Sequence, residues 1–244
     1  INLINTVRGF LAQVEGENNP YAQECKELAQ LVAAPQLAWT PEENGKTKLS
    51  YARTSKYDNL LRYEGYELIL KILRYLYQID AYISIAEVAR ERGFVFAEAL
   101  PLGGNILEIE GMFHPLIENA IPNSIQADAE HNVVFLTGAN MAGKSTFMKT
   151  FGIVVYLAHM GFPLPVKKMR FSVQNGMYTT INLPDNMMLG YSHFYAEVQR
   201  LKKVAEQVGR IGNLVIVFDE LFRGTNVKDA HEATLAVMEA FAEK

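Results

Sequence analysis

The chain has 244 residues, of which 49% are hydrophobic and 20% are charged, with a formal net charge of -4 and a single cysteine. This composition is typical of a globular protein with one large domain or two smaller ones. It excludes an internal disulfide, and it argues against a domain that grips nucleic acid by itself, because such a domain usually carries a basic face. No apolar run reaches the length of a membrane span and no signal-peptide pattern opens the chain, so we expect a cytoplasmic protein with no membrane partner.

The N-terminal part of the chain, residues 1–93, is predicted to be helical. Its apolar residues recur at the spacing of an amphipathic helix, and no stretch alternates as a strand does. The clearest periodicity predicts one long helix over residues 57–92, which Gly93 ends. Residues 35–48 hold proline, asparagine and glycine and are predicted to form a loop.

Beyond Gly93 the chain alternates between short apolar runs and helical patterns. The runs predict strands at 94–97, 106–109, 132–136, 168–173, 177–181 and 214–218. The helical patterns lie at 145–160, 192–208 and 229–243. This alternation predicts that residues 94–244 form an α/β domain with a largely parallel core sheet.

A phosphate-loop motif follows the apolar run at 132–136. Residues 137–146 read TGANMAGKST, which is the pattern Gly-x-x-x-x-Gly-Lys-Ser between a predicted strand and a predicted helix. Glycines let the backbone wrap closely around phosphates, and the helix N-terminus supplies positive potential. We expect Lys144 to reach the β- and γ-phosphates and Ser145 to offer its hydroxyl to Mg²⁺. The expected nucleotide-binding residues are Gly138, Ala139, Asn140, Met141, Ala142, Gly143, Lys144, Ser145 and Thr146.

Two adjacent carboxylates follow the continuous apolar run at 214–218. Asp219 and Glu220 therefore stand at the C-terminal end of a predicted central strand, which is the edge where open α/β sheets bind ligands. Asp219 is predicted to hold Mg²⁺ opposite Ser145, and Glu220 to orient or deprotonate the attacking water. No Asn-Lys-x-Asp run, which usually marks guanine specificity, follows the second motif. The adjacent Asp and Glu favour hydrolysis of ATP over phosphoryl transfer to a small molecule, so the expected cofactors are ATP and Mg²⁺.

The phosphate loop resembles that of the MutS family of DNA mismatch-repair ATPases, whose usual form is TGPNM(A/G)GKST. Other stretches resemble that family in the same order along the chain. They are QIDAYISIAEVA at 78–89, GMFHPLIE at 111–118, DNMMLGYSHFYAE at 185–197 and DELFRGTN at 219–226. The chain is thus similar to a MutS-type P-loop ATPase domain of the ABC-like class, preceded by a helical core or lever segment.

The resemblance implies a dimer with composite ATP sites at its interface, and ATP would drive closure of this dimer on DNA. Asn140 would join Lys144 and Glu220 in catalysis, near the γ-phosphate and the attacking water. Ser192 would lie in a signature loop that acts on the partner subunit's nucleotide. The loop that crosses the interface would contain Thr225, Asn226 and Asp229. The implied partners are a second copy of the protein and DNA, the latter held mostly by regions outside these residues.

The sequence departs from the family pattern at several positions. Phe222 stands where the family has glycine, Asn226 where it has serine and His193 where it has threonine. These changes predict a MutS paralogue rather than the mismatch-recognising protein. The chain begins with Ile1 and ends before a further strand that the family carries, so we expect a fragment that binds and hydrolyses ATP weakly.

Two other functions remain open from the sequence. An ATPase of the SMC or Rad50 type shares the phosphate loop but carries a longer signature motif. A nucleotide-sensing scaffold would bind ATP to control assembly with little turnover.

Overall fold

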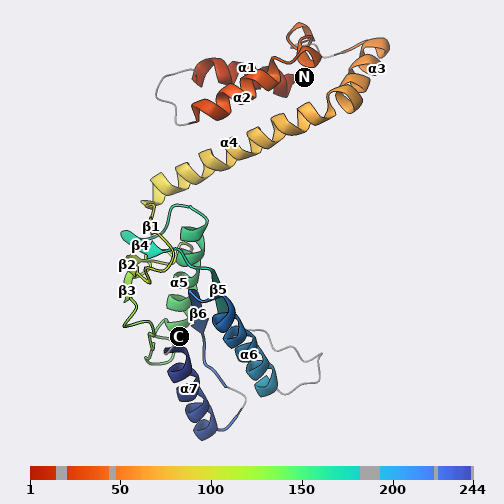
Figure 1. The fold of residues 1–244 in the computed structure, drawn as a ribbon. Helices are drawn as coiled ribbons and strands as arrows, with labels where there is room; N and C mark the ends of the chain where they lie inside the picture. The colour runs from red at the N-terminus through yellow and green to blue at the C-terminus, as the bar shows by residue number, and fades with distance from the viewer. Residues whose placement is uncertain (15–20, 44–47, 182–192, 223–224, 243–244) are drawn as a thin grey trace. The chain divides into compact units, whose positions relative to one another are not determined.

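The computed structural model describes residues 1–14, 21–43, 48–181, 193–222 and 225–242. They form two compact units, Ile1–Ser84 and Ile85–Lys244. The division falls within the long helix α4, Tyr66–Arg92, which ends beside the domain boundary expected after residue 93 (Figure 1). Taken together, the described residues make a mixed α/β protein.

The first unit is built from helices around an apolar core. Its helices are α1 (Asn2–Val14), α2 (Ala22–Val32), α3 (Tyr51–Asn59) and the first part of α4. Two short 3₁₀ turns, η1 (Pro35–Leu37) and η2 (Pro41–Glu43), occupy the loop expected at 35–48. The buried core residues come from α1, α2, η1 and α4, and they are Ile4, Val7, Leu11, Leu28, Val32, Leu37 and Ile72.

The single helix expected over residues 57–92 is interrupted. A π-helical turn, η3 (Leu60–Glu64), separates α3 from α4. The Gly65 N–H donates to the carbonyl of Leu60, five residues back, instead of continuing the i→i−4 ladder. Apolar periodicity could not reveal this interruption, because leucines and tyrosines continue across it at helical spacing.

Arg8 joins the ends of several elements in the first unit. Its Nη2 donates to the carbonyls of Val32 at 2.6 Å and Leu37 at 3.0 Å, which are the last residues of α2 and η1. Its Nη1 donates to Oγ1 of the buried Thr40 at 2.7 Å. Carbonyls at helix ends lack intrahelical donors, and the guanidinium supplies one to Val32. The carbonyl of Leu37 also accepts from the N–H of Thr40 at 3.1 Å and from its hydroxyl at 2.8 Å, so Arg8 and Thr40 together fix the end of η1.

Replacing Arg8 with methionine should therefore destabilise the first unit. Methionine keeps much of the apolar stem but removes all the donors, and we expect a loss of about 2–3 kcal/mol in the free energy of unfolding. Urea unfolding of the chain followed by circular dichroism measures this loss. The matched control is Arg74→Met, since Arg74 is exposed on α4. Equal unfolding midpoints for the two variants would contradict the role assigned to Arg8.

The second unit contains two sheets. The first has the strand order β1 (Glu98–Leu100), β4 (Lys168–Ser172), β2 (Leu107–Met112), β3 (Asn123–Ala127), and the second pairs β5 (Gly176–Thr180) with β6 (Leu214–Phe218). The pairs β1–β4 and β5–β6 are parallel, whereas β2 runs antiparallel to both of its neighbours. The expectation of a largely parallel core sheet is therefore wrong for the four-stranded sheet. Apolar runs identify strands, but they do not identify which strands pair.

The strand predicted at residues 132–136, just before the phosphate loop, is absent from both described sheets. Its side chains lie open to solvent, with Val134 52% and Phe135 68% exposed. A strand needs a hydrogen-bonded neighbour, and β6 pairs only with β5 among the described strands. The run expected at 94–97 likewise forms only an isolated bridge between Val95 and Leu164.

The remaining predictions for this unit agree closely with the structure. The strands expected at 106–109, 168–173, 177–181 and 214–218 appear as β2, β4, β5 and β6. The helices expected at 145–160, 192–208 and 229–243 appear as α5 (Lys144–His159), α6 (His193–Ile211) and α7 (Val227–Ala242). No helix in the described ranges is both long enough and apolar enough to cross a membrane.

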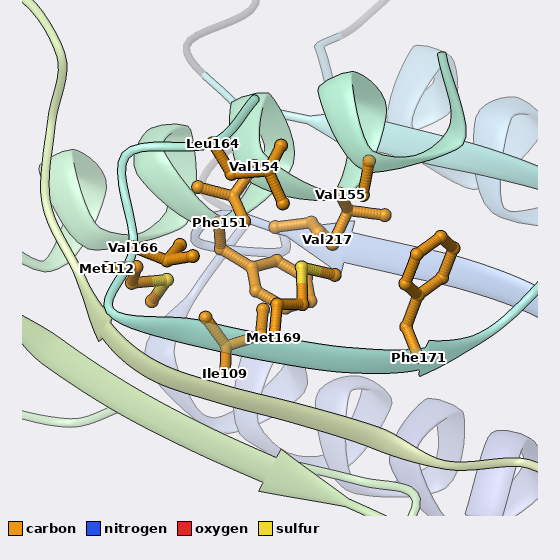
Figure 2. Packing of buried hydrophobic residues seen from close by; sticks show 11 residues of the cluster. Ile109, Met112, Phe151, Val154, Val155, Leu164, Val166, Met169, Phe171 and Val217 are labelled. Atoms are coloured by element: carbon orange, nitrogen blue, oxygen red, sulfur yellow. The ribbon is translucent and has the colours of Figure 1, made fainter. Parts of the chain in front are cut away.

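The core of the second unit packs helix α5 against strands β2 and β4, as Figure 2 shows. Phe151, Val154 and Val155 of α5 are buried among side chains from these strands, and Val217 of β6 joins the same cluster. Helix α5 begins at the phosphate loop and β6 ends at the acid pair, so both segments are joined to elements that contribute to this core.

Candidate functional site

The phosphate loop forms a turn that leads directly into α5. Gly143 has φ +93° and stands at the N-cap of α5, so the loop enters the helix through a left-handed residue that glycine adopts without strain. No side chain caps this helix. The first amides of α5 have no intrahelical acceptor, so they can serve an anion.

The side chain of Lys144 folds over the loop. Its Nζ donates to the carbonyl oxygens of Gly138 at 2.7 Å and Ala139 at 2.9 Å. Both bonds hold the ammonium at the loop, where phosphate oxygens could replace the carbonyls as acceptors. Asn140 and Met141 lie exposed at the tip of the loop, and the Ala142 N–H donates to Ala139 and closes the turn.

Ser145 and Asp219 meet, although 74 positions separate them in sequence. The Ser145 hydroxyl donates to Oδ2 of Asp219 at 3.3 Å, and both residues are partly buried. One comes from the first turn of α5 and the other from the residue after β6. A hydroxyl beside a carboxylate is an oxygen donor set that suits Mg²⁺, which usually takes few protein ligands and completes its shell with phosphate and water.

The segment after β6 turns sharply. Glu220 has φ +43° and Phe222 has φ +63°, both in the left-handed region that non-glycine residues rarely adopt. Glu220 is exposed at the end of the strand, whereas Phe222 is buried. The Phe222 ring lies 5.6 Å from that of Phe194 in α6, measured between centroids.

A tight turn precedes the run that leads into the phosphate loop. Oδ1 of Asp128 accepts hydrogen bonds from the backbone N–H groups of Glu130 at 2.9 Å and His131 at 2.7 Å. These backbone donors, that of His131 first, lower the pKa of the Asp128 carboxyl below its ordinary value. At the next residue, Asn132 donates from Nδ2 to the carbonyl of Ala242 at 3.4 Å, which ties the start of the run to the end of α7.

Residues 134–244 match the family described as MutS domain V. The DNA mismatch repair protein MutS of Thermus aquaticus is 32% identical over 181 residues, which is 73% of this chain and 21% of that protein. The protein of the same name from Aquifex pyrophilus is 29% identical over 255 residues, covering 98% of this chain and 29% of that protein.

Residues 134–244 belong to the MutS family. Most of the chain is similar to MutS proteins, and the chain spans less than a third of the length of these relatives. The match favours the MutS interpretation over the SMC or Rad50 type that the phosphate loop left open.

The MutS resemblance assigns Ser192 and the loop with Thr225, Asn226 and Asp229 to a dimer interface, and the structure describes only the loop residues. Ser192 lies outside the described residues. Asn226 accepts from the Asp229 N–H at 3.0 Å through Oδ1 and donates from Nδ2 to Oδ2 of Asp229 at 2.6 Å. Asn226 therefore caps α7, and Thr225 donates its N–H to the carbonyl of Phe222. Their role at an interface stays a prediction.

Some of these contacts had a signal in the sequence and others did not. An asparagine followed three residues later by an acidic residue has the spacing of a capping box, so the cap of α7 could have been predicted from Asn226 and Asp229. The contact between Phe194 and Phe222 had no such signal, because it joins segments whose spacing only the fold determines.

Proposed function

We propose that this chain binds ATP together with Mg²⁺ and hydrolyses it, as part of a MutS-type DNA repair or recombination protein. In the proposed cycle, ATP drives closure of a dimer of the full-length protein on DNA. The observation that carries the proposal is the contact between Ser145 and Asp219 at 3.3 Å. It joins the phosphate loop to the acid pair in one place, as a Mg²⁺-dependent nucleotide site requires.

The residues of the loop would bind and orient the triphosphate. The uncapped amides at the start of α5 and the ammonium of Lys144, which lies on the loop carbonyls, both place positive charge at the loop. The phosphate oxygens would replace the carbonyls of Gly138 and Ala139 as acceptors for Lys144. Asn140, exposed at the loop tip, is free to approach the γ-phosphate.

Ser145 and the acid pair after β6 would hold the metal and orient the water. Ser145 and Asp219 would hold Mg²⁺, which when bound neutralises charge on the phosphate oxygens. Glu220 would orient a water and accept its proton as the water oxygen attacks the γ-phosphorus. The bond between that phosphorus and the bridging oxygen breaks, and ADP and phosphate are released.

The proposal is tested by comparing ATP turnover and ATP binding in wild type and in Glu220→Gln. Glutamine keeps the size of the side chain and removes the proton acceptor, so turnover should fall by about 100-fold or more while ATP binding stays within about threefold. A steady-state phosphate-release assay and an equilibrium binding assay measure the two quantities. Equal turnover in both proteins would contradict the role of Glu220. Binding without turnover in the wild type would instead support the nucleotide-sensing scaffold.

A further inference from the structure

The turn after β6 adopts a backbone conformation that its residues do not favour. Glu220 and Phe222 both have positive φ, at +43° and +63°. A glycine at either position would adopt such angles without steric cost. Non-glycine residues persist there only where their surroundings hold them, so the side chain of Phe222 must contribute something that a glycine would lack.

The contribution comes from the ring of Phe222. Only 3% of Phe222 is exposed, and its ring packs on Phe194 at a centroid distance of 5.6 Å with the planes tilted by 44°. This distance lies in the range of favourable aromatic pairs. Phe194 belongs to the first turn of α6, so the contact ties the turn after β6 to the start of that helix.

The acid pair lies between two aromatic contacts. On the strand side, Phe218 packs on Phe241 of α7 with centroids 5.9 Å apart and planes at 70°. On the far side, Phe222 packs on Phe194, and its carbonyl accepts from the Thr225 N–H at 3.3 Å. Asp219 and Glu220 thus occupy a short segment with an aromatic contact on each side, and Glu220 has a left-handed backbone conformation within that segment.

We propose that Phe222 is a positioning residue for Glu220. Its contact with Phe194 holds the left-handed turn that aims the Glu220 carboxylate, and it couples that carboxylate to the position of α6. The inference rests on the proposed hydrolysis of ATP, and it adds a buried residue that would act through Glu220. A shift of α6 would be transmitted through the aromatic pair to the group that orients the water.

The informative variants separate the ring from the backbone. Phe222→Gly keeps the backbone angles accessible and removes the ring, Phe222→Leu keeps an apolar side chain, and Phe194→Leu alters the other half of the pair. The matched control is Phe171→Leu, because Phe171 is also buried, at 2% exposed, but lies on β4 in the four-stranded sheet. All four are compared with wild type below their unfolding temperatures.

The first readout is the split between kcat and KM for ATP. Misplacing a catalytic group lowers kcat far more than it changes binding, so Phe222→Gly should lower kcat by about 10- to 100-fold and alter KM by less than about threefold. Phe222→Leu should recover part of the loss, and Phe171→Leu should stay within about twofold of wild type. A wild-type kcat in Phe222→Gly, or an equal loss in Phe171→Leu, would overturn the proposal.

The second readout is independent of activity. Hydrogen exchange of the Thr225 amide reports whether the backbone of Phe222 keeps its position, because that amide donates to the carbonyl of Phe222. Phe194→Leu and Phe222→Gly should both accelerate its exchange, and Phe171→Leu should not. If wild type hydrolyses no ATP, the proposed function is wrong, and hydrogen exchange alone then tests whether Phe222 is coupled to α6. Unchanged exchange in Phe194→Leu would then overturn the coupling.

Discussion

Replacing Lys144 with alanine should weaken ATP binding about 100-fold, because charge-assisted hydrogen bonds worth about 3 kcal/mol in total would be lost from the phosphates. The ammonium already lies at the loop, held by the carbonyls of Gly138 and Ala139. Its removal takes away a cation at the loop, while the amides of α5 remain. Isothermal titration calorimetry with Mg²⁺ and ATP measures the change in affinity.

The control for this prediction is Lys149→Ala. Lys149 lies exposed on the same helix, so its removal changes the net charge equally without touching the loop. If both variants lose the same affinity, the effect is one of overall charge, and the role assigned to Lys144 is wrong.

Asp219→Asn should abolish most of the Mg²⁺-dependent turnover. Asparagine can still accept the hydrogen bond that Ser145 donates, so the fold of the strand end is preserved. It lacks the negative charge that attracts the metal, and we expect kcat to fall by about 100- to 1000-fold. Activity measured against Mg²⁺ concentration should show a raised half-saturation point together with the lower maximum.

The matched control is Asp80→Asn, which removes one carboxylate charge from an exposed position on α4. It should leave the Mg²⁺ dependence unchanged. A normal Mg²⁺ dependence in Asp219→Asn would show that the metal is held elsewhere.

The elements that position the site were largely predictable from the sequence. Strand β6 follows from five consecutive apolar residues, and its bounds agree with the expectation. Helix α5 follows from the phosphate-loop motif, because the motif places a glycine at the helix N-cap and an apolar helical pattern follows it. Ser145 and Asp219 were expected to face each other, because the phosphate-loop motif and the acid after a central strand together predict a Mg²⁺ site, and the two side chains are in contact.

Other features depended on information that local patterns lack. The run at 132–136 is apolar enough for a buried strand, yet its pairing partner decides whether it becomes one. Strand β3 (Asn123–Ala127) escaped prediction because polar residues occupy most of it, and its pairing with β2 holds it in the sheet. The left-handed turn at Glu220 depends on a tertiary contact with α6, so no spacing within the sequence could reveal it.

ATP binding to this chain with and without Mg²⁺ tests the proposed nucleotide site most directly. We predict saturable binding of one ATP, with a Kd no weaker than about 1 mM, that weakens when EDTA removes the metal and weakens further in Lys144→Ala. Absence of saturable binding, or binding that neither EDTA nor Lys144→Ala alters, would contradict the proposal that the phosphate loop and Asp219 form one nucleotide site.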